Sequence, residues 1–279
     1  MSQQYSQAVE TAKEYYNSDD ADNFYFHIWG GEDIHIGLYH EDNEDIAIAS
    51  QRTVATMAQR IIDIKPHSRV IDIGAGYGGA ARWLAKNFDC NVTCINLSEA
   101  QNQRNLAQSE IAELADKIEV HDASFESIPC EDSSFDIGWS QDAILHSGHR
   151  SQVMDEINRV LKPGGEVIMT DPMQADECPE GVLQPVLERI HLDTLGSFAF
   201  YRQEAERLGW EVVNIEDLTY QLVRHYSRVR ENLIARGDEL KNHVSSEYIE
   251  RMIVGLGHWI DAGNNGYLAW GIMHFRKPQ

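Results

Sequence analysis

Residues Val70–Gly79 read VIDIGAGYGG, and this stretch decides the fold. It begins with a short apolar run that contains one acid, Asp72, as expected of a strand buried in a parallel sheet. Glycines follow at positions 74, 76, 78 and 79, where they allow positive φ and a close approach of the backbone to a ligand. A lone G-x-G-x-x-G is a weak signal, but a strand before it and a helix after it indicate a nucleotide-binding turn. We therefore expect a ligand with a nucleoside portion directly after this strand.

Outward from this loop, strand and helix patterns alternate along the chain. The sequence predicts helices at 79–88, 98–114 and 149–161, the second capped by Ser98 and the third stopped by Pro163-Gly164-Gly165. It predicts strands at 69–73, 91–96, 117–121, 135–140, 166–171, 210–218 and 267–277. Such alternation predicts an α/β fold with a mostly parallel sheet and helices on both faces.

Helical segments flank the alternating region. Apolar residues recur at helical spacing over 5–16 and 47–64, and a helical insertion at 219–262 precedes the last strand. We expect a single domain over 1–279, because no linker or repeat interrupts it. Its parts would be an N-terminal helical lid segment (1–64), a cofactor-binding core (65–175) and a C-terminal half of the sheet (176–279).

Charge and composition exclude several classes of partner. The 279 residues carry 45 acidic and 23 basic side chains, a formal net charge of −22. Such a surface repels nucleic acid and anionic lipid, and it suits a salt-rich cytoplasm in which counter-ions screen self-repulsion. The polar N-terminus lacks the apolar centre of a signal peptide, and no apolar run reaches the roughly 20 residues of a membrane span. We expect a cytoplasmic protein with a small-molecule partner, and the sequence carries no signal of an oligomeric state.

Two acids and a second glycine turn favour S-adenosylmethionine over a dinucleotide. That molecule has no phosphate, but it has a ribose, an adenine and a cationic amino-acid tail. Asp72 can support the loop and the cationic tail, and Asp122, after the third strand, can accept from an adenine amine. The turn LKPGG at 161–165 precedes the fifth strand.

Together with VIDIGAGYGG, the segments INLSEAQNQRN, DASFESIPCEDSSFD and RVLKPGG resemble the class I methyltransferases over about residues 65–175. The resemblance implies a Rossmann-like fold with seven strands, a helical lid and S-adenosyl-L-methionine as cofactor. Asn96 departs from the pattern, since an acid usually binds both ribose hydroxyls there, although a carboxamide can also bond a hydroxyl pair. The implied cofactor-binding residues are Asp72, Gly74, Ala75, Gly76, Asn96, Leu97, Gln101, Asp122, Ala123, Ser140 and Gln141.

Segments outside the core indicate the methyl acceptor. YFHIWGGEDIHIGLY (25–39), WSQDAILHS (139–147) and YLAWGI (267–272) resemble the sarcosine/dimethylglycine N-methyltransferases, and this resemblance spans nearly the whole chain. It implies N-methylation of dimethylglycine, and of sarcosine, to the osmoprotectant glycine betaine. It extends more weakly to phosphoethanolamine and sterol methyltransferases.

An acceptor of this kind needs aromatic faces for its amine end and an arginine or backbone amides for its carboxylate. Orientation of the amine behind the methyl group supplies most of the rate, and His146 is a candidate base. Tyr25, Trp29 and His146 are the expected catalytic residues. The expected acceptor-binding residues are Tyr25, Trp29, Gln141, His146, Tyr201, Arg202, Tyr226 and Trp270, with Asp142, Arg189, Arg224 and Trp259 as further candidates.

Other functions remain open from sequence alone. The acceptor could be glycine or phosphoethanolamine, or a lipid or sterol carbon, although the acidic charge argues against phosphate and lipid. A nicotinamide-dependent dehydrogenase and a non-catalytic binding protein with this fold are alternatives of other classes. No metal is expected, because His27, His35 and His40 do not form a convincing ligand set.

Overall fold

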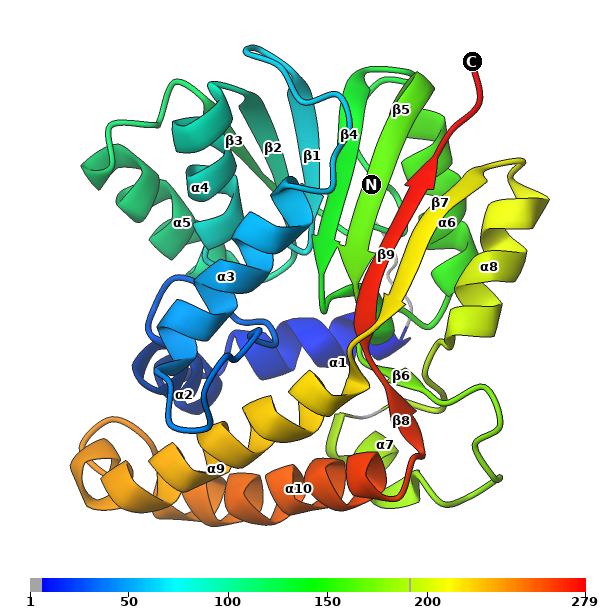
Figure 1. Ribbon diagram of the computed structural model, residues 1–279. Coiled ribbons are helices and arrows are strands. Elements are labelled where there is room, and N and C mark those ends of the chain that lie inside the picture. The colour runs from blue at the N-terminus through cyan, green and yellow to red at the C-terminus, as the bar shows by residue number, and fades with distance from the viewer. Residues whose placement is uncertain (1–6, 191) are drawn as a thin grey trace.

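The computed structural model describes residues 7–190 and 192–279 and contains one large, mostly parallel sheet (Figure 1). Its order is β3-β2-β1-β4-β5-β9-β7, in which the first five strands are parallel and β9 is antiparallel to both its neighbours. The predicted fold class is confirmed. The strands are β1 (Arg69–Ile73), β2 (Asn91–Asn96), β3 (Ile118–Asp122), β4 (Phe135–Gln141), β5 (Leu161–Thr170), β7 (Glu211–Asp217) and β9 (Gly271–Arg276), and a small second sheet pairs β6 (Met173–Gln174) with β8 (Leu268–Ala269).

Helices cover both faces of the sheet because its strands are apolar on both sides. Val70 packs into a core shared with α3 (Ile46–Ala58) and α4 (Gly79–Phe88), whereas Ile71 and Ile73 pack into a second core. The second core includes residues of α6 (Arg150–Val160) and α8 (Phe198–Arg207). A further helix, α5 (Glu99–Ile111), packs beside β2 and β3. The alternation of Val70 and Ile71 thus follows the strand period of two.

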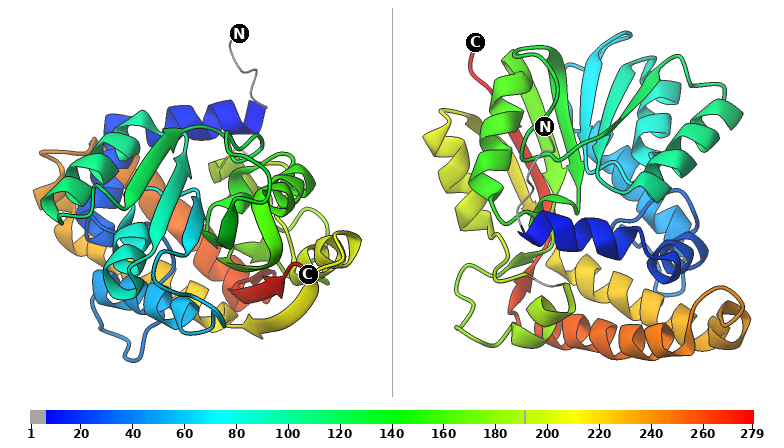
Figure 2. Two further views of the ribbon diagram at one scale, coloured as in Figure 1. Left: turned by 90° about the horizontal axis from the view of Figure 1, so that it is seen from above. Right: turned by 180° about the vertical axis from the view of Figure 1, so that it is seen from behind.

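A helical cap lies beyond the carboxyl ends of the parallel strands (Figure 1). Figure 2 shows α1 between the sheet and the paired helices α9 and α10. Phe24, Trp29, Leu233 and Tyr248 share a third hydrophobic core within this cap. The cap thereby brings helices from the first 30 residues together with helices from residues 219–264 over the sheet edge at which α/β proteins bind ligands. Its helices are α1 (Gln7–Tyr16), α2 (Asp19–Trp29), α9 (Thr219–Leu240) and α10 (Ser246–Asn264), and α7 (Gln184–Ile190) packs against α10.

Local sequence explains where two of the core helices begin. Ser98 caps α5 as predicted, because its hydroxyl accepts a hydrogen bond from Gln101 N at 3.3 Å. Gly78 precedes α4 with a φ of 75°, and a Cβ there would lie 2.0 Å from Asn105 Oδ1. Only glycine fits this junction of loop and helix.

The structure corrects several predicted boundaries. The helix predicted to reach 161 ends at Val160, and β5 starts at Leu161, so Pro163-Gly164-Gly165 lies within the strand. The helix predicted over 47–64 ends at Ala58, α2 was not predicted, and the insertion 219–262 is two helices. Residues 5 and 6 of the first predicted helix lie outside the described residues.

The predicted last strand, 267–277, is in fact two strands in different sheets. The break falls at Trp270, whose backbone N–H donates to the Thr219 hydroxyl and whose carbonyl accepts from Leu218 N–H. The backbone N–H and carbonyl of Trp270 therefore bond the residues before α9 and at its start in place of a neighbouring strand, and β8 turns away from β9.

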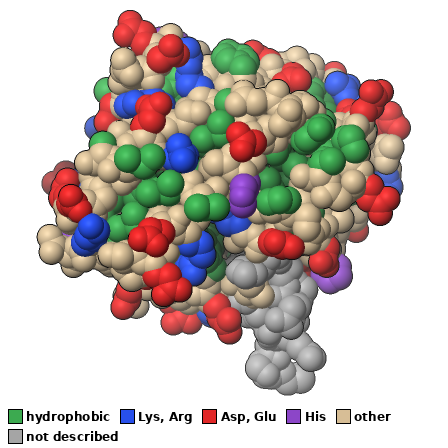
Figure 3. Space-filling model, turned by 90° about the horizontal axis from the view of Figure 1, so that it is seen from below, with side chains coloured by type: hydrophobic (Ala, Val, Ile, Leu, Met, Phe, Trp, Pro, Cys, Tyr) green, Lys and Arg blue, Asp and Glu red, His purple; other side chains and the backbone are tan. Residues whose placement is uncertain are grey.

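The surface carries charges of both signs. Figure 3 shows the face of the cap, where Asp and Glu side chains are spread over the surface with Lys and Arg side chains among them. Within residues 7–190 and 192–279, every helix is too short or too polar to cross a bilayer.

Candidate active site

A cavity lies where β1, β2 and β4 end, at the edge of the sheet at which α/β proteins bind ligands. We call it the donor cavity. Six predicted cofactor-binding residues line it: Gly74, Gly76, Asn96, Leu97, Gln101 and Gln141. The remaining wall comes from Lys13, Tyr16, Ile34, Ser98, Phe125, Asp142, Ala143 and His146.

The glycine loop gives this cavity its floor. Gly74 has a φ of 78°, and a Cβ there would lie 2.3 Å from the Cβ of Ala143. Gly76 has a φ of 54° and lines the cavity, with Ile34 Cδ1 the nearest atom, 3.6 Å from a Cβ built at this position. A side chain at Gly76 would therefore meet little protein and would extend into the space for a ligand.

Asp72 lies beneath this loop with an unsatisfied carboxylate oxygen. Its side chain is buried, and Oδ2 has no hydrogen-bond partner among the described residues. Burial raises the pKa of Asp72 to about 7, although the nearby His35 charge lowers it. Asp72, a predicted cofactor-binding residue, does not itself line the donor cavity, so a cation bound there would stabilise this carboxylate from the other side of the loop.

Asn96 is held by a carboxamide network at the end of β2. Its Nδ2 donates to Gln101 Oε1 and to Asn102 Oδ1, both at 3.1 Å. Because the amide nitrogen is engaged, the carbonyl oxygen remains to accept from a hydroxyl of a ligand. The network explains how Asn can stand where an acid was expected.

Other predicted cofactor residues do not line the donor cavity. Ser140 is turned into the sheet, where its hydroxyl donates to Ile73 O at 2.9 Å. Asp122 is exposed beside Asn96 in the strand register, and Ala123 is buried behind it. Phe125 forms the wall on this side instead. Ala75 also lies outside the wall and bonds Ile95 O through its backbone N–H.

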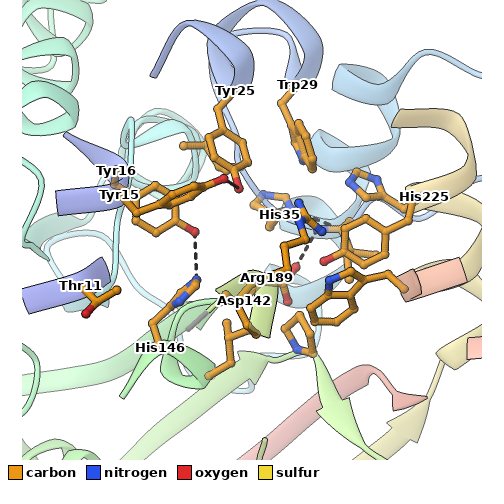
Figure 4. Close-up of a pocket in the computed structure, with 17 residues that line it drawn as sticks. Thr11, Tyr15, Tyr16, Tyr25, Trp29, His35, Asp142, His146, Arg189 and His225 are labelled. Carbon is orange, nitrogen blue, oxygen red and sulfur yellow. Dashed lines mark hydrogen bonds between the residues drawn. The ribbon is translucent and has the colours of Figure 1, made fainter. Parts of the chain in front are cut away.

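A second cavity lies between the cap helices and the end of β4 (Figure 4). We call it the acceptor cavity. Tyr16, Ile34, Asp142 and His146 line both cavities, so they form the boundary between donor and acceptor. The other residues that line it are Thr11, Tyr15, Tyr25, Trp29, His35, Ile36, Leu145, Pro172, Arg189, Ile190, His225, Tyr226 and Trp259.

The predicted aromatic residues at the two ends of the chain meet in this cavity. The Tyr25 and Trp29 rings lie 5.0 Å apart, and the Tyr226 and Trp259 rings lie 5.1 Å apart, measured between centroids. Tyr15 and Tyr16, from α1, were not predicted. The available signal was a pair of adjacent tyrosines in an otherwise polar helix.

Four residues predicted to bind the acceptor are placed elsewhere by the structure. Tyr201 lies on the buried side of α8, where its hydroxyl donates to Asp171 Oδ2 at 2.7 Å, and Arg202 is exposed on the same helix. Gln141 lines only the donor cavity. Trp270 lies behind the wall of the acceptor cavity, where it bonds Asp142.

Arg189 is the arginine that enters the acceptor cavity. Of the other two candidates, Arg202 is on the surface and Arg224 bonds Tyr39 O and pairs with Asp42. Arg189 Nη2 contacts only the sulfur of Met252, at 3.6 Å, and no carboxylate among the described residues pairs with it. A guanidinium without a counter-charge, in a chain of net charge −22, suits an anionic ligand group.

His146 stands at the boundary between the cavities. Its Nε2 lies 2.9 Å from the Tyr16 hydroxyl. Burial, and to a smaller extent the charge of Arg150, lowers the pKa of His146 to about 4. The imidazole is therefore neutral at pH 7 and binds a proton only weakly.

Asp142 occupies the same boundary in a strained conformation. Its φ is 52°, in the left-handed region that non-glycine residues seldom adopt. Oδ2 accepts from Ile36 N at 2.7 Å and Oδ1 from Trp270 Nε1 at 2.8 Å. Burial raises the pKa of Asp142, while the charge of His35 lowers it. Strain of this kind persists at functional sites, where the surroundings fix the residue.

The described residues contain no group of three or more His, Cys, Asp or Glu side chains that could hold a metal ion.

Comparison with known proteins identifies the family of the chain. A family model described as "Methyltransferase domain" matches residues 71–169. Sarcosine/dimethylglycine N-methyltransferase of Halorhodospira halochloris is 57% identical over 271 residues, which are 97% of this chain and 97% of that protein. The chain belongs to the sarcosine/dimethylglycine N-methyltransferase family.

Two further proteins match nearly the whole length of this methyltransferase. The Aphanothece halophytica protein named sarcosine/dimethylglycine N-methyltransferase is 55% identical and covers 97% of this chain and 98% of its own length. A crystal structure from Galdieria sulphuraria, assigned to the same group, has a TM-score of 0.90 and 45% identity and covers 95% of this chain and 99% of that one. The predicted class, an S-adenosylmethionine-dependent methyltransferase, is confirmed.

Proposed function

We propose that this methyltransferase methylates the amine of dimethylglycine, and of sarcosine, and so forms glycine betaine. The observation that carries the proposal is Arg189, an arginine without a carboxylate partner among the described residues, in a cavity walled by aromatic rings. Relatives named for these two acceptors support it at 57% and 55% identity.

The donor cavity fits S-adenosylmethionine on three observations. Gly76 leaves room for a ligand, the unpaired Asp72 Oδ2 lies below the loop, and Asn96 offers an acceptor for a ribose hydroxyl. Leu97 and Phe125 add apolar surface for a flat base. When bound, S-adenosylmethionine supplies a methyl group already activated by its sulfonium centre.

The acceptor cavity holds both ends of a small amino acid. The rings of Tyr25, Trp29, Tyr226 and Trp259 can surround the methylated nitrogen, because aromatic faces attract such groups. Arg189 can bind the carboxylate. The wall shared with the donor cavity then places the nitrogen near the methyl group, and this orientation supplies most of the rate.

The amine must be neutral when it attacks. His146, with its pKa lowered to about 4, is a weak base, so we propose that the acceptor loses its proton to water before transfer. His146 and Tyr16 then serve to hold the boundary wall in place. The carboxylate of Asp142 faces both cavities and can stabilise positive charge as it develops on the nitrogen.

A screen of methyl acceptors tests this function. Labelled S-adenosylmethionine is incubated with glycine, sarcosine, dimethylglycine and phosphoethanolamine, and transfer is measured for each. We expect transfer to dimethylglycine and sarcosine. If neither is methylated, the substrate assignment is wrong although the fold and the enzyme class stand.

The single-domain organisation and the cellular setting are also proposals. We propose that 1–64 and 219–262 act as a lid over the cofactor-binding core.

The net charge of −22 fits a salt-rich cytoplasm, because salt screens repulsion between acidic side chains. The thermal midpoint should then rise with added potassium chloride.

A further inference from the structure

Three ring nitrogens in the wall of the acceptor cavity have neither a hydrogen-bond partner nor an ion-pair partner among the described residues. They are Trp29 Nε1, Trp259 Nε1 and His225 Nε2, and each is buried. A fourth, His35 Nε2, also lacks a hydrogen bond, but it lies 3.3 Å from Asp33 Oδ1. Buried polar groups are nearly always paired, so three unpaired groups in one cavity call for a physical explanation. A ligand that only accepts hydrogen bonds would satisfy them.

The hydrogen bonds of His225 fix which of its nitrogens carries the proton. Nδ1 lies 3.1 Å from the backbone nitrogen of Gly37 and 2.9 Å from the Tyr39 hydroxyl. A backbone N–H can only donate, so Nδ1 must accept and carries no proton. Neutral His225 therefore has its proton on Nε2, which is the atom without a partner.

The same surroundings keep this histidine neutral. Burial, followed by the charge of His35, lowers the pKa of His225 to about 3. A second proton would have to go to Nδ1, where the Gly37 N–H already points. His225 is thus a hydrogen-bond donor of fixed direction and zero charge.

The position of His225 connects the unpaired groups. Its ring lies 5.3 Å from Trp29 and 5.7 Å from Tyr226, and Tyr226 is in turn 5.1 Å from Trp259. Figure 4 shows His225 beside Trp29 on the wall of the cavity that Arg189 also lines. The lining of the acceptor cavity therefore includes neutral N–H donors and a guanidinium, groups that bind a carboxylate.

We propose that His225 determines the selectivity of the enzyme for acceptors with a carboxylate, by donating a hydrogen bond from Nε2 to that carboxylate alongside Arg189. This inference rests on the proposed function. A hydroxyl at the same place would receive a weaker bond, because hydrogen bonds to charged groups are the stronger ones. His225 is therefore a binding residue that separates amino acids from amino alcohols of similar size.

Binding of glycine betaine and choline tests the proposal without catalysis. Both carry a trimethylammonium group, but choline has a hydroxyl in place of the carboxylate. Each is titrated by calorimetry into enzyme saturated with S-adenosylhomocysteine. For His225→Leu we expect the Kd of betaine to rise about 10- to 100-fold and that of choline to change less than about 2-fold.

Two variants control this experiment. His225→Gln keeps an N–H donor near the position of Nε2 and should recover most of the affinity for betaine. His243→Leu removes an exposed histidine of the cap and should change neither Kd. Equal losses of betaine and choline binding in His225→Leu would overturn the role of His225. Failure of the unaltered enzyme to bind betaine would instead overturn the proposed function itself.

NMR of the unaltered enzyme labelled with ¹⁵N-histidine tests the tautomer directly, even if His225→Leu does not fold. The His225 signals, assigned by their loss in His225→Gln, should show a neutral ring protonated at Nε2 from pH 6 to 8. Betaine should shift the Nε2 proton downfield, and choline should shift it less. A ring protonated at Nδ1, or an Nε2 proton that ignores betaine, would overturn the proposal.

Discussion

The indole Nε1 of Trp270 donates to Oδ1 of Asp142 at 2.8 Å and so joins the residue before β9 to the residue after β4. Trp270 is fully buried, and it does not line either cavity. Asp142 lines both cavities with a φ of 52°. Trp270 was expected to touch the acceptor, and we propose that it acts on the acceptor through Asp142.

Trp270→Phe should therefore lower activity and stability together. The variant leaves Asp142 Oδ1 buried without its donor, which costs about 1–3 kcal/mol of the free energy of unfolding. Because one bond that favours the carboxylate is lost, the pKa of Asp142 should rise further and kcat should fall. Urea unfolding and steady-state kinetics measure both effects. Trp83→Phe changes a half-buried tryptophan on α4; it is the matched control and should leave kcat unchanged.

The core of the fold could be predicted because its signals are local. Strand 69–73, the helix at 79–88 and strand 91–96 were predicted with the bounds that the structure has, since each is an apolar run closed by glycines or polar residues. The break at Trp270 was missed because it depends on bonds to Leu218 and Thr219, some 50 residues earlier. Sequence periodicity does not register such bonds.

The donor cavity was easier to predict than the acceptor cavity for a similar reason. Asn96 ends β2, and Gly74, Gly76 and Gln101 follow the ends of β1 and β2, which parallel topology places at one edge. The acceptor cavity is assembled by tertiary packing of the cap. Arg189 lies on α7, which packs against α10, whereas Arg202 lies on α8, which packs against β7. With seven residues, α7 is too short to show a periodic pattern that would reveal this packing.

Gly76→Val should abolish binding of S-adenosylmethionine. The valine side chain would occupy the donor cavity, and a φ of 54° adds strain of about 1–2 kcal/mol. Gly181→Val is a matched control, because Gly181 has a φ of 81° and no atom within 4 Å of an added Cβ. Calorimetric titration with S-adenosylhomocysteine measures binding by both variants. Loss of binding in Gly76→Val but not in Gly181→Val would show that the side chain fills the cavity and that backbone strain is not the cause. Normal binding by Gly76→Val would show that the cofactor is placed wrongly.

Arg189→Leu should raise the KM for dimethylglycine by roughly 10- to 100-fold, since a hydrogen bond to a charged group contributes about 1.5–3 kcal/mol. The KM for S-adenosylmethionine should change little, because Arg189 does not line the donor cavity. Arg202→Leu removes an arginine that is exposed on α8 and should leave both constants unchanged. An effect of Arg202→Leu as large as that of Arg189→Leu would contradict the assigned carboxylate site.

The pH dependence of kcat/KM should reflect the pKa of the acceptor's amine and not the pKa of His146. With its pKa lowered to about 4, His146 is neutral throughout pH 6–9, so its titration falls outside this range. We expect kcat/KM for dimethylglycine to rise about tenfold per pH unit while the amine is mostly protonated. His146→Asn should lower the whole profile, because Tyr16 loses its partner, and keep its shape. A profile that becomes flat in this variant would identify His146 as the base.

Binding of S-adenosylmethionine should release a proton from Asp72. Burial holds the pKa of the free enzyme's Asp72 at about 7, so this carboxyl is mostly protonated at pH 6. Before the ligand binds, the folded state holds the proton more tightly than the unfolded state, whose carboxyl titrates near 3.9. The stability that this group contributes is thus present at low pH and is lost as the pH rises from about 4 to about 7.

A cationic ligand lowers the pKa of Asp72 and so releases its proton. Calorimetry at pH 6 in buffers of different ionisation enthalpy should detect a release of roughly one proton that disappears in Asp72→Asn. Equal proton release by Asp72→Asn and the unaltered enzyme would show that Asp72 does not sense the cofactor.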